Sequence, residues 1–261
     1  MNINSFFLYF VLPAFTLFLI FTNRYYYSKK ESQRMRFNMR EDLFFGNIVG
    51  PIVGLIAVLA IYGTILNIQF VRELRWELLS IFSITILTLL FGIGVGGHIA
   101  AVSIEKSLKN NEMTEETDHI LYFFHWPVGH KLTYVPAALV FYVLVLLDLF
   151  KGVPEQLRSY QLVLLSTFSF ALAIAAAISL IVTHVTRITF YTLLIISVSI
   201  IIMVNYESIT LVKHSIAYFF TNLFFFLLGM ITIYRYSHHV SNRLHVFIHS
   251  KFKDGDKVKD E

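Results

Sequence analysis

Histidines are the side chains of this sequence best suited to chemistry, because the 261-residue chain contains no cysteine. Without thiolates, a metal site must be built from histidine, carboxylate or neutral oxygen donors. Several such donors fall near one another in the middle of the chain: His98, Glu105, Asp118, His119, His125 and His130. A divalent ion held by His98 with His125 or His130 would acidify a bound water or polarise an ester or amide oxygen. Asp118 or Glu105 is the candidate for the acid–base step.

The stretch DHILYFFHWPVGH, residues 118–130, holds three of these histidines in unequal positions. On a helix, three-and-four spacing places His125 on the face that carries Asp118. His119 shares a neighbouring face with Trp126, so we expect it to point at lipid headgroups. The two later histidines are therefore the better candidates for metal ligands.

Pro127 and Gly129 are expected to break the helix that contains this stretch. A single helix over residues 119–150 would be about 48 Å long, whereas a bilayer core is about 30 Å thick. We therefore expect residues 118–126 to form a short amphipathic or re-entrant helix at the membrane surface, with the next span beginning near Thr133. Such a hinge would fold the later histidines toward the preceding span.

Histidines farther along the chain extend the candidate ligand set. All except His214 are expected on one membrane side, and the predicted metal ligands are His98, His125, His130, His184 and His239. Zinc or iron is the expected ion. A b-type haem with His98 and His184 as axial ligands is the alternative cofactor. A second interpretation needs no cofactor, since aromatic and amphipathic side chains gather at membrane interfaces without binding anything.

Membrane helices must position these side chains. Hydrophobic residues make up 56% of the chain and charged residues only 15%, which lies outside the usual composition of soluble domains. Seven apolar stretches approach the ~20 residues that a bilayer crossing requires: they lie near 6–22, 43–66, 79–102, 132–150, 161–183, 188–205 and 212–234. The sequence thus predicts an all-α, polytopic membrane bundle. Its weakest point is the turn at 183–189, which has no glycine or proline; without that turn the count is six.

Basic residues gather on one side of this bundle. Six lysines and arginines lie between residues 24 and 40, and six more between 235 and 259. Because cytoplasmic loops carry such an excess, we expect an outside N-terminus, a cytoplasmic C-terminus and a plasma or inner membrane. The bundle, residues 1–234, forms one domain. Residues 235–261 form a basic amphipathic tail, expected to lie on anionic lipid.

Two stripes of small residues predict where the second and third spans touch. Small residues at intervals of four let helix backbones approach each other in lipid. The expected partners are Gly46, Gly50 and Gly54 on one span and Gly92, Gly96 and Ala100 on the other. This contact would place the second span beside His98.

The leading functional hypothesis is a multi-pass membrane protein with a His/carboxylate metal site, acting as a lipid-directed, metal-dependent hydrolase. The alternatives are a haem electron-transfer protein and a non-enzymatic transporter, sensor or assembly subunit. Whether the chain is an enzyme stays open. Expected partners are the lipid bilayer and another membrane protein, not nucleic acid. The pattern of seven-helix alkaline ceramidases does not fit, because the second span has no histidine and the HxxxH at His245 and His249 lies in the tail.

Overall fold

Helices make up most of the structure. The computed structural model describes residues 74–107, 114–151, 154 and 156–237, with short pieces of the preceding chain at 12–13, 16–17, 35–36, 39–40, 44, 48–49, 52–56, 58–59 and 61–62. Its long helices are α5 (Leu74–Ser107), α7 (Lys131–Lys151), α8 (Ser159–Val182), α9 (Thr186–Tyr206) and α10 (Ser215–Tyr236). Its short helical segments are α6 (Glu115–Phe123), the π-helix η3 (Phe124–His130) and the 3-10 helix η4 (Leu211–Lys213). Two short strands, β1 (Met35–Arg36) and β2 (Met39–Arg40), pair antiparallel.

Five stretches of the described chain are long and apolar enough to cross a membrane: Leu79–Glu105, Glu115–Phe150, Ser159–Val182, Thr186–Tyr206 and Ser215–Tyr236. They correspond to the last five predicted spans and agree with a helical membrane bundle. The first two predicted spans, 6–22 and 43–66, lie largely outside the described residues. Their described pieces join the core, where Leu12 and Val58 are buried.

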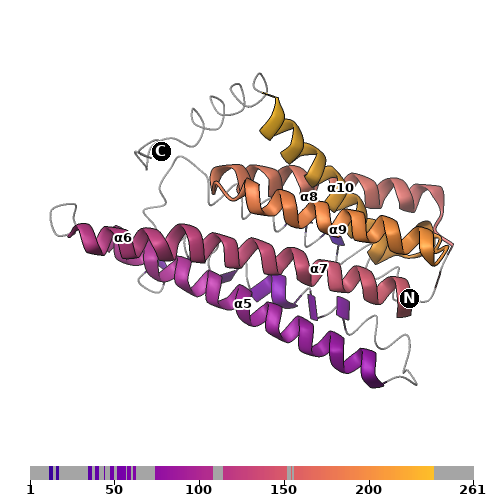
Figure 1. Cartoon of the computed structure of the whole chain (residues 1–261), viewed down its shortest axis with the longest axis horizontal. Coiled ribbons are helices and arrows are strands. Elements are labelled where there is room, and N and C mark those ends of the chain that lie inside the picture. Colours follow the sequence, from indigo (N-terminus) through magenta and orange to yellow (C-terminus); the bar gives the residue numbers. More distant parts are fainter. Residues whose placement is uncertain are drawn as a thin grey trace.

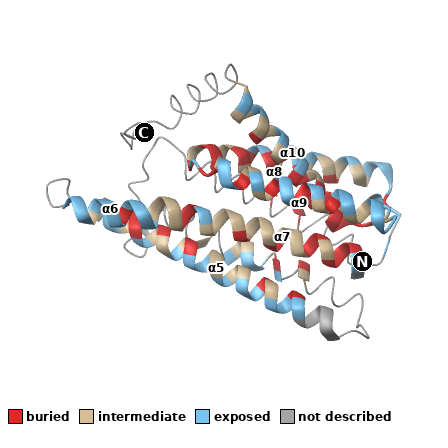
Figure 2. Ribbon diagram, in the orientation of Figure 1, coloured by how far each residue is buried: buried red, intermediate tan, exposed pale blue. Residues whose placement is uncertain are grey.

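The long helices form two layers (Figure 1). In one layer α5 runs antiparallel to the rod made by α6, η3 and α7, and it contacts η3 and α7 along its length. The other layer holds α8, α9 and α10, with α10 packed on both neighbours and across the layers on α7. Buried residues gather between the helices and large apolar side chains are exposed on the outer faces (Figure 2), as expected for a surface covered by lipid.

Contacts between the layers come largely from α7. The ring of Phe141 stacks on Phe220 of α10, with centroids 4.7 Å apart. The hydroxyl of Tyr134 lies 2.8 Å from Ser179 Oγ of α8. Interhelical hydrogen bonds of this kind contribute roughly 0.6 kcal/mol each in membrane proteins. Packing and hydrogen bonds together therefore fix α7 against the second layer.

The turn between α8 and α9 reverses the chain without glycine, so the predicted spans on either side of it are separate helices. After Val182, His184 adopts a φ of 53°. The N–H of Val185 donates to Leu180 O at 3.2 Å, which is the six-to-one bond of a Schellman motif. Histidine is among the residues that tolerate left-handed backbone. Ser208 repeats the conformation after α9, with a φ of 51°.

The helices of the first layer come closest at Gly94. A Cβ atom at this position would lie 2.6 Å from Leu132 C and 2.7 Å from Thr133 N. These are backbone atoms of α7, which cannot move aside as the end of a flexible side chain can. Only glycine therefore allows this approach.

The predicted glycine stripes do not form this contact. Side chains added at Gly54, Gly92 or Gly96 would meet no described atom within 4 Å. The expected contact is therefore not found at these three positions. Gly46 and Gly50 lie outside the described residues, so the contact predicted for them stays a prediction. The face of α5 that is covered by α7 carries Gly94 instead, two residues from Gly92 and about 160° around the helix.

The predicted break at Pro127 does not reverse the chain, so a re-entrant helix over 118–126 is wrong. α6, η3 and α7 continue along one axis (Figure 1) and give an apolar stretch of 36 residues, about 54 Å long. Proline lacks an N–H, and in an α-helix its ring clashes with the carbonyl four residues earlier. The wider π-helical turn of η3 accommodates Pro127 without ending the helix.

A buried carboxylate joins the far end of α7 to the start of α10. Asp148 Oδ2 accepts a hydrogen bond from the N–H of Ala217 at 2.8 Å, and Asp148 is buried. The residue that precedes α10, His214, makes no side-chain cap bond. The cap therefore comes from a side chain on another helix.

Replacing Gly94 by alanine should lower the free energy of unfolding in detergent by about 1–3 kcal/mol, because the added Cβ overpacks the contact with α7. Gly92→Ala is the matched control on the same helix. It should be neutral or stabilising by up to about 1 kcal/mol, since alanine is the better helix former. Thermal unfolding of both variants measures this, and equal shifts would contradict the close approach at Gly94.

Removing the carboxylate with Asp148→Ala should destabilise the protein by about 1–3 kcal/mol, because a buried N–H of α10 loses its acceptor. Asp148→Asn retains an acceptor oxygen and should lose less. Unfolding of the two variants in the same detergent is the measurement. Equal stability of the alanine and asparagine variants would show that the cap contributes nothing.

Candidate metal centre

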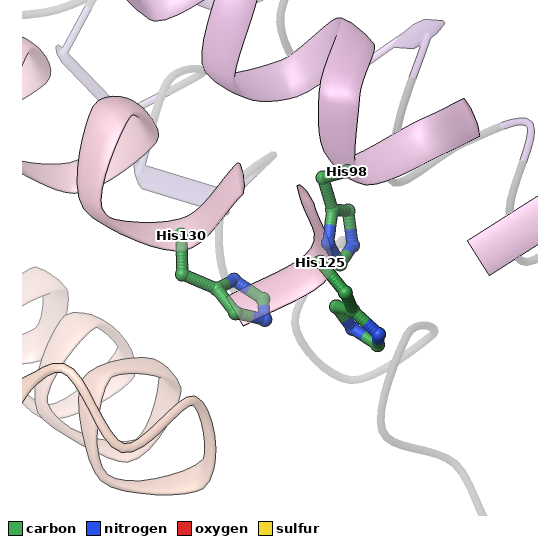
Figure 3. Close-up of side chains that lie close together, drawn as sticks. All are labelled: His98, His125 and His130. Atoms are coloured by element: carbon green, nitrogen blue, oxygen red, sulfur yellow. The ribbon is translucent and has the colours of Figure 1, made fainter. Parts of the chain in front are cut away.

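Three histidines from two helical segments meet where α5 passes η3 (Figure 3). His98 comes from α5, and His125 and His130 come from η3. One ring nitrogen of each lies within 4.8 Å of the other two. His98 and His130 are buried, whereas the His125 side chain is 14% exposed. Among these three residues, which are called the histidine cluster below, His125 is therefore the most exposed.

The hydrogen bonding of η3 explains why His125 and His130 share one position. Five residues separate them, which in an α-helix would turn the two side chains about 140° apart. The i→i+5 pattern of a π-helix instead brings residues five apart onto successive turns of one face. Both rings thus lie near the ring of His98, which extends from α5 (Figure 3).

A missing side chain at Gly129 lets η3 approach α5. A Cβ atom there would lie 2.8 Å from both His98 Cβ and Phe124 O. Gly97, the neighbour of His98, has more room, since its added Cβ would lie 3.8 Å from Val128 Cγ1. Gly129 is therefore the position where any side chain would push His98 away from the other two histidines.

Glu105 reaches the cluster from the end of α5. Its Oε2 atom lies 3.2 Å from Nδ1 of His125, and its side chain is 42% exposed. It follows His98 by seven residues, two turns along the same face, and His125 occupies the space between them. A carboxylate that accepts a hydrogen bond from Nδ1–H fixes the tautomer and leaves Nε2 available to an ion.

Aromatic rings enclose the cluster on the side of α7. Trp126 stacks on His125, with ring centroids 5.0 Å apart and planes at 17°, and it also contacts His130 at 4.9 Å. Tyr134 stacks on His130 at 6.2 Å, and its hydroxyl is bonded to Ser179 of α8. The two histidines of η3 are therefore held between fixed rings.

The other predicted site residues are not members of the group of three converging histidines. Asp118 is exposed in the first turn of α6, two turns before His125. His119 is also exposed. His184 is exposed in the turn after α8, where its ring lies 5.6 Å from that of Trp126. His239 lies outside the described residues.

The cluster can accommodate a metal ion after a small inward movement of the rings. Tetrahedral zinc with bonds of about 2.0–2.1 Å requires ligand nitrogens about 3.3 Å apart. Starting from 4.8 Å, each nitrogen would move by roughly 0.9 Å to reach that geometry. Three protein ligands also leave a coordination position open, which is the pattern of catalytic zinc sites, whereas structural sites use four.

Comparisons with known proteins return no match: no protein-family model, no curated protein and no solved structure matches this chain. The geometry of the histidine cluster is accordingly the basis for a functional proposal.

The sequence does not predict that Trp126 and Tyr134 line the cluster. Helical spacing groups Trp126 with His119 on a lipid-facing surface, whereas the π-helical turn rotates its ring onto His125 and His130. The available signal is a proline between two histidines five residues apart inside an apolar helix. That spacing favours a π-helical turn once the helix is known to continue.

A pair of engineered cysteines tests the approach of η3 to α5, because the chain has no cysteine of its own. His98→Cys with Gly129→Cys should form a disulfide on mild oxidation, since the added Cβ would lie 2.8 Å from that of residue 98. A small outward movement of the two helices brings these Cβ atoms to the separation of about 3.5–4.5 Å that disulfides require. Mass spectrometry after thiol alkylation detects the bond.

The matched control for this pair is Gly96→Cys with Gly129→Cys, which should stay reduced because Gly96 faces away from every described atom. Disulfide formation in both pairs, or in neither, would contradict the arrangement of the cluster.

Proposed function

We propose that this chain is a membrane metalloprotein that binds a divalent ion, zinc or iron, through His98, His125 and His130 and hydrolyses a lipid-like substrate. The observation that supports the metal site is the convergence of three imidazole nitrogens within 4.8 Å, two of them on buried side chains. Neutral imidazole is a preferred ligand of both ions. Glu105 positions His125 through its contact with Nδ1.

Hydrolysis is the chemistry that three neutral ligands favour. They leave the charge of the ion uncompensated, so the ion acidifies a water bound in the open position. That water would add to an ester or amide carbonyl, and the leaving group would take up a proton as its bond to the carbonyl carbon breaks. The exposed part of Glu105 makes it the residue best placed for that proton transfer, since Asp118 lies two turns away.

The position of the cluster suits a substrate that arrives from the bilayer. Exposed aromatic and apolar side chains of α6 and η3 precede it, among them Tyr122, Phe123 and Phe124. The exposed charge of Lys131 follows it directly. An amphiphile with a reactive bond near its headgroup would meet the ion at this boundary. The basic segments at 24–40 and 235–259 support placing the site on the cytoplasmic side of a plasma or inner membrane.

A haem group has less support than a single ion. The rings closest to His98 are those of His125 and His130, at 4.8 and 4.6 Å. Trp126 contacts both the cluster and His184. A macrocycle with His98 and His184 as axial ligands would need the space that the indole fills.

Metal content of the purified chain tests the site. After loading with zinc and desalting in mild detergent, the protein should retain about one ion per chain. His98→Ala, His125→Ala and His130→Ala should each lose it, and Glu105→Gln should bind about 10–100-fold more weakly. Inductively coupled plasma mass spectrometry gives the stoichiometry.

The matched control is His119→Ala, which removes an exposed histidine from the same helical rod and should retain the ion. Identical metal content in all four alanine variants would contradict the proposed metal site. Release of fatty acid from fluorogenic acyl-ester and acyl-amide lipids tests the reaction separately. If the chain binds metal but hydrolyses neither lipid, the metal site is supported and the proposed hydrolase activity is contradicted.

A further inference from the structure

Two arginines meet at the ends of α9 and α10. Arg187 lies in the first turn of α9 and Arg235 in the last turn of α10. The Nη1 group of Arg235 donates a hydrogen bond to the main-chain oxygen of Arg187 at 3.5 Å. Three residues before Arg187, His184 contacts Trp126. This arginine pair therefore lies at the same end of the bundle as the histidine cluster but outside it.

Aromatic rings hold Arg235 in place. Its Cζ atom lies 5.1 Å from the ring centroid of Phe190 and 5.9 Å from those of Tyr191 and Tyr236. Cation–π contacts at such distances are attractive, and they orient the planar guanidinium without neutralising it. The positive charge is thus fixed at the helix ends.

No acidic side chain forms an ion pair with either arginine in the part of the chain that the structure describes, where the one ion pair found joins His125 and Glu105. The two arginines stand at neighbouring helix ends, and together they add positive charge to this end of the bundle. Guanidinium groups match phosphate oxygens with several parallel N–H donors. An external anion of the phosphate type would therefore complete this arrangement.

We propose that Arg187 and Arg235 form a binding site for the phosphate of an anionic phospholipid headgroup. The ends of membrane helices lie at headgroup level, where tyrosine and arginine are the usual anchors. Tyr191 and Tyr236 are exposed beside the pair and Ile188 offers an apolar surface next to Arg187. A lipid satisfies both the charge and the apolar surface, whereas a soluble phosphate satisfies the charge alone. The site does not depend on a bound metal.

Lipid retention by the full chain tests this site. The protein is reconstituted in vesicles of phosphatidylcholine and phosphatidylglycerol, extracted in mild detergent and washed, and its bound lipids are quantified by mass spectrometry. The native chain should be enriched in phosphatidylglycerol. Arg187→Gln and Arg235→Gln should each lower that enrichment about fivefold. Arg235→Lys keeps the charge without the planar donors and should give an intermediate value.

Arg158→Gln is the matched control, because Arg158 is an exposed arginine that directly precedes α8. It should retain as much phosphatidylglycerol as the native chain. Equal retention by all the glutamine variants would overturn the site. A different outcome is that inorganic phosphate raises the thermal stability in lipid-free detergent while the chain shows no preference between the two lipids. That outcome would overturn the lipid site and identify the ligand as a soluble phosphate compound. His98→Ala should leave lipid retention unchanged, which separates this result from that of the metal centre.

Discussion

The π-helical turn at Phe124–His130 determines the positions of the residues around the histidine cluster. Its i→i+5 hydrogen bonds bring His125 and His130 onto one face and let the helix continue past Pro127. A regular α-helix through the same residues would direct one ring away from α5. The close approach at Gly129 then sets the distance to His98 on the facing helix. The hydrogen bonds of the π-helical turn and the absence of a side chain at Gly129 thus bring together histidines that are far apart in the sequence.

Helix α7 connects the histidine cluster to the other helices of the bundle. At its start it continues from the histidine cluster, and Tyr134 links His130 to Ser179 of α8. In its first turns it meets α5 at Gly94, and near its end Asp148 caps α10. A site built on helices packed at several points is held more exactly than one built on loops. This rigidity of the backbone suits a metal centre, because only the imidazole rings then have to adjust when an ion binds.

Hydropathy predicts the five long apolar helices of the described residues, because a lipid-exposed backbone must satisfy its own hydrogen bonds, which leaves long helices as the usual solution. Side-chain chemistry likewise singled out His98, His125 and His130, which the structure brings together. The helical break at Pro127 failed as a prediction because proline can be absorbed by a π-helical turn as well as by a hinge. The spacing of four did not identify Gly94, because it marks several faces of a glycine-rich helix and only tertiary contacts select one of them. Asp118 shares a predicted helical face with His125, but it is exposed in the first turn of α6 and is not a member of the converging group.

The central claim is that these three histidines form the first coordination sphere of one ion. X-ray absorption at the zinc edge of the loaded full chain measures that sphere directly. The account predicts three imidazole nitrogens at about 2.0–2.1 Å together with one oxygen from water. A sphere made of oxygen alone, or one with a single imidazole, would contradict it, because the ion would then lie elsewhere on the chain.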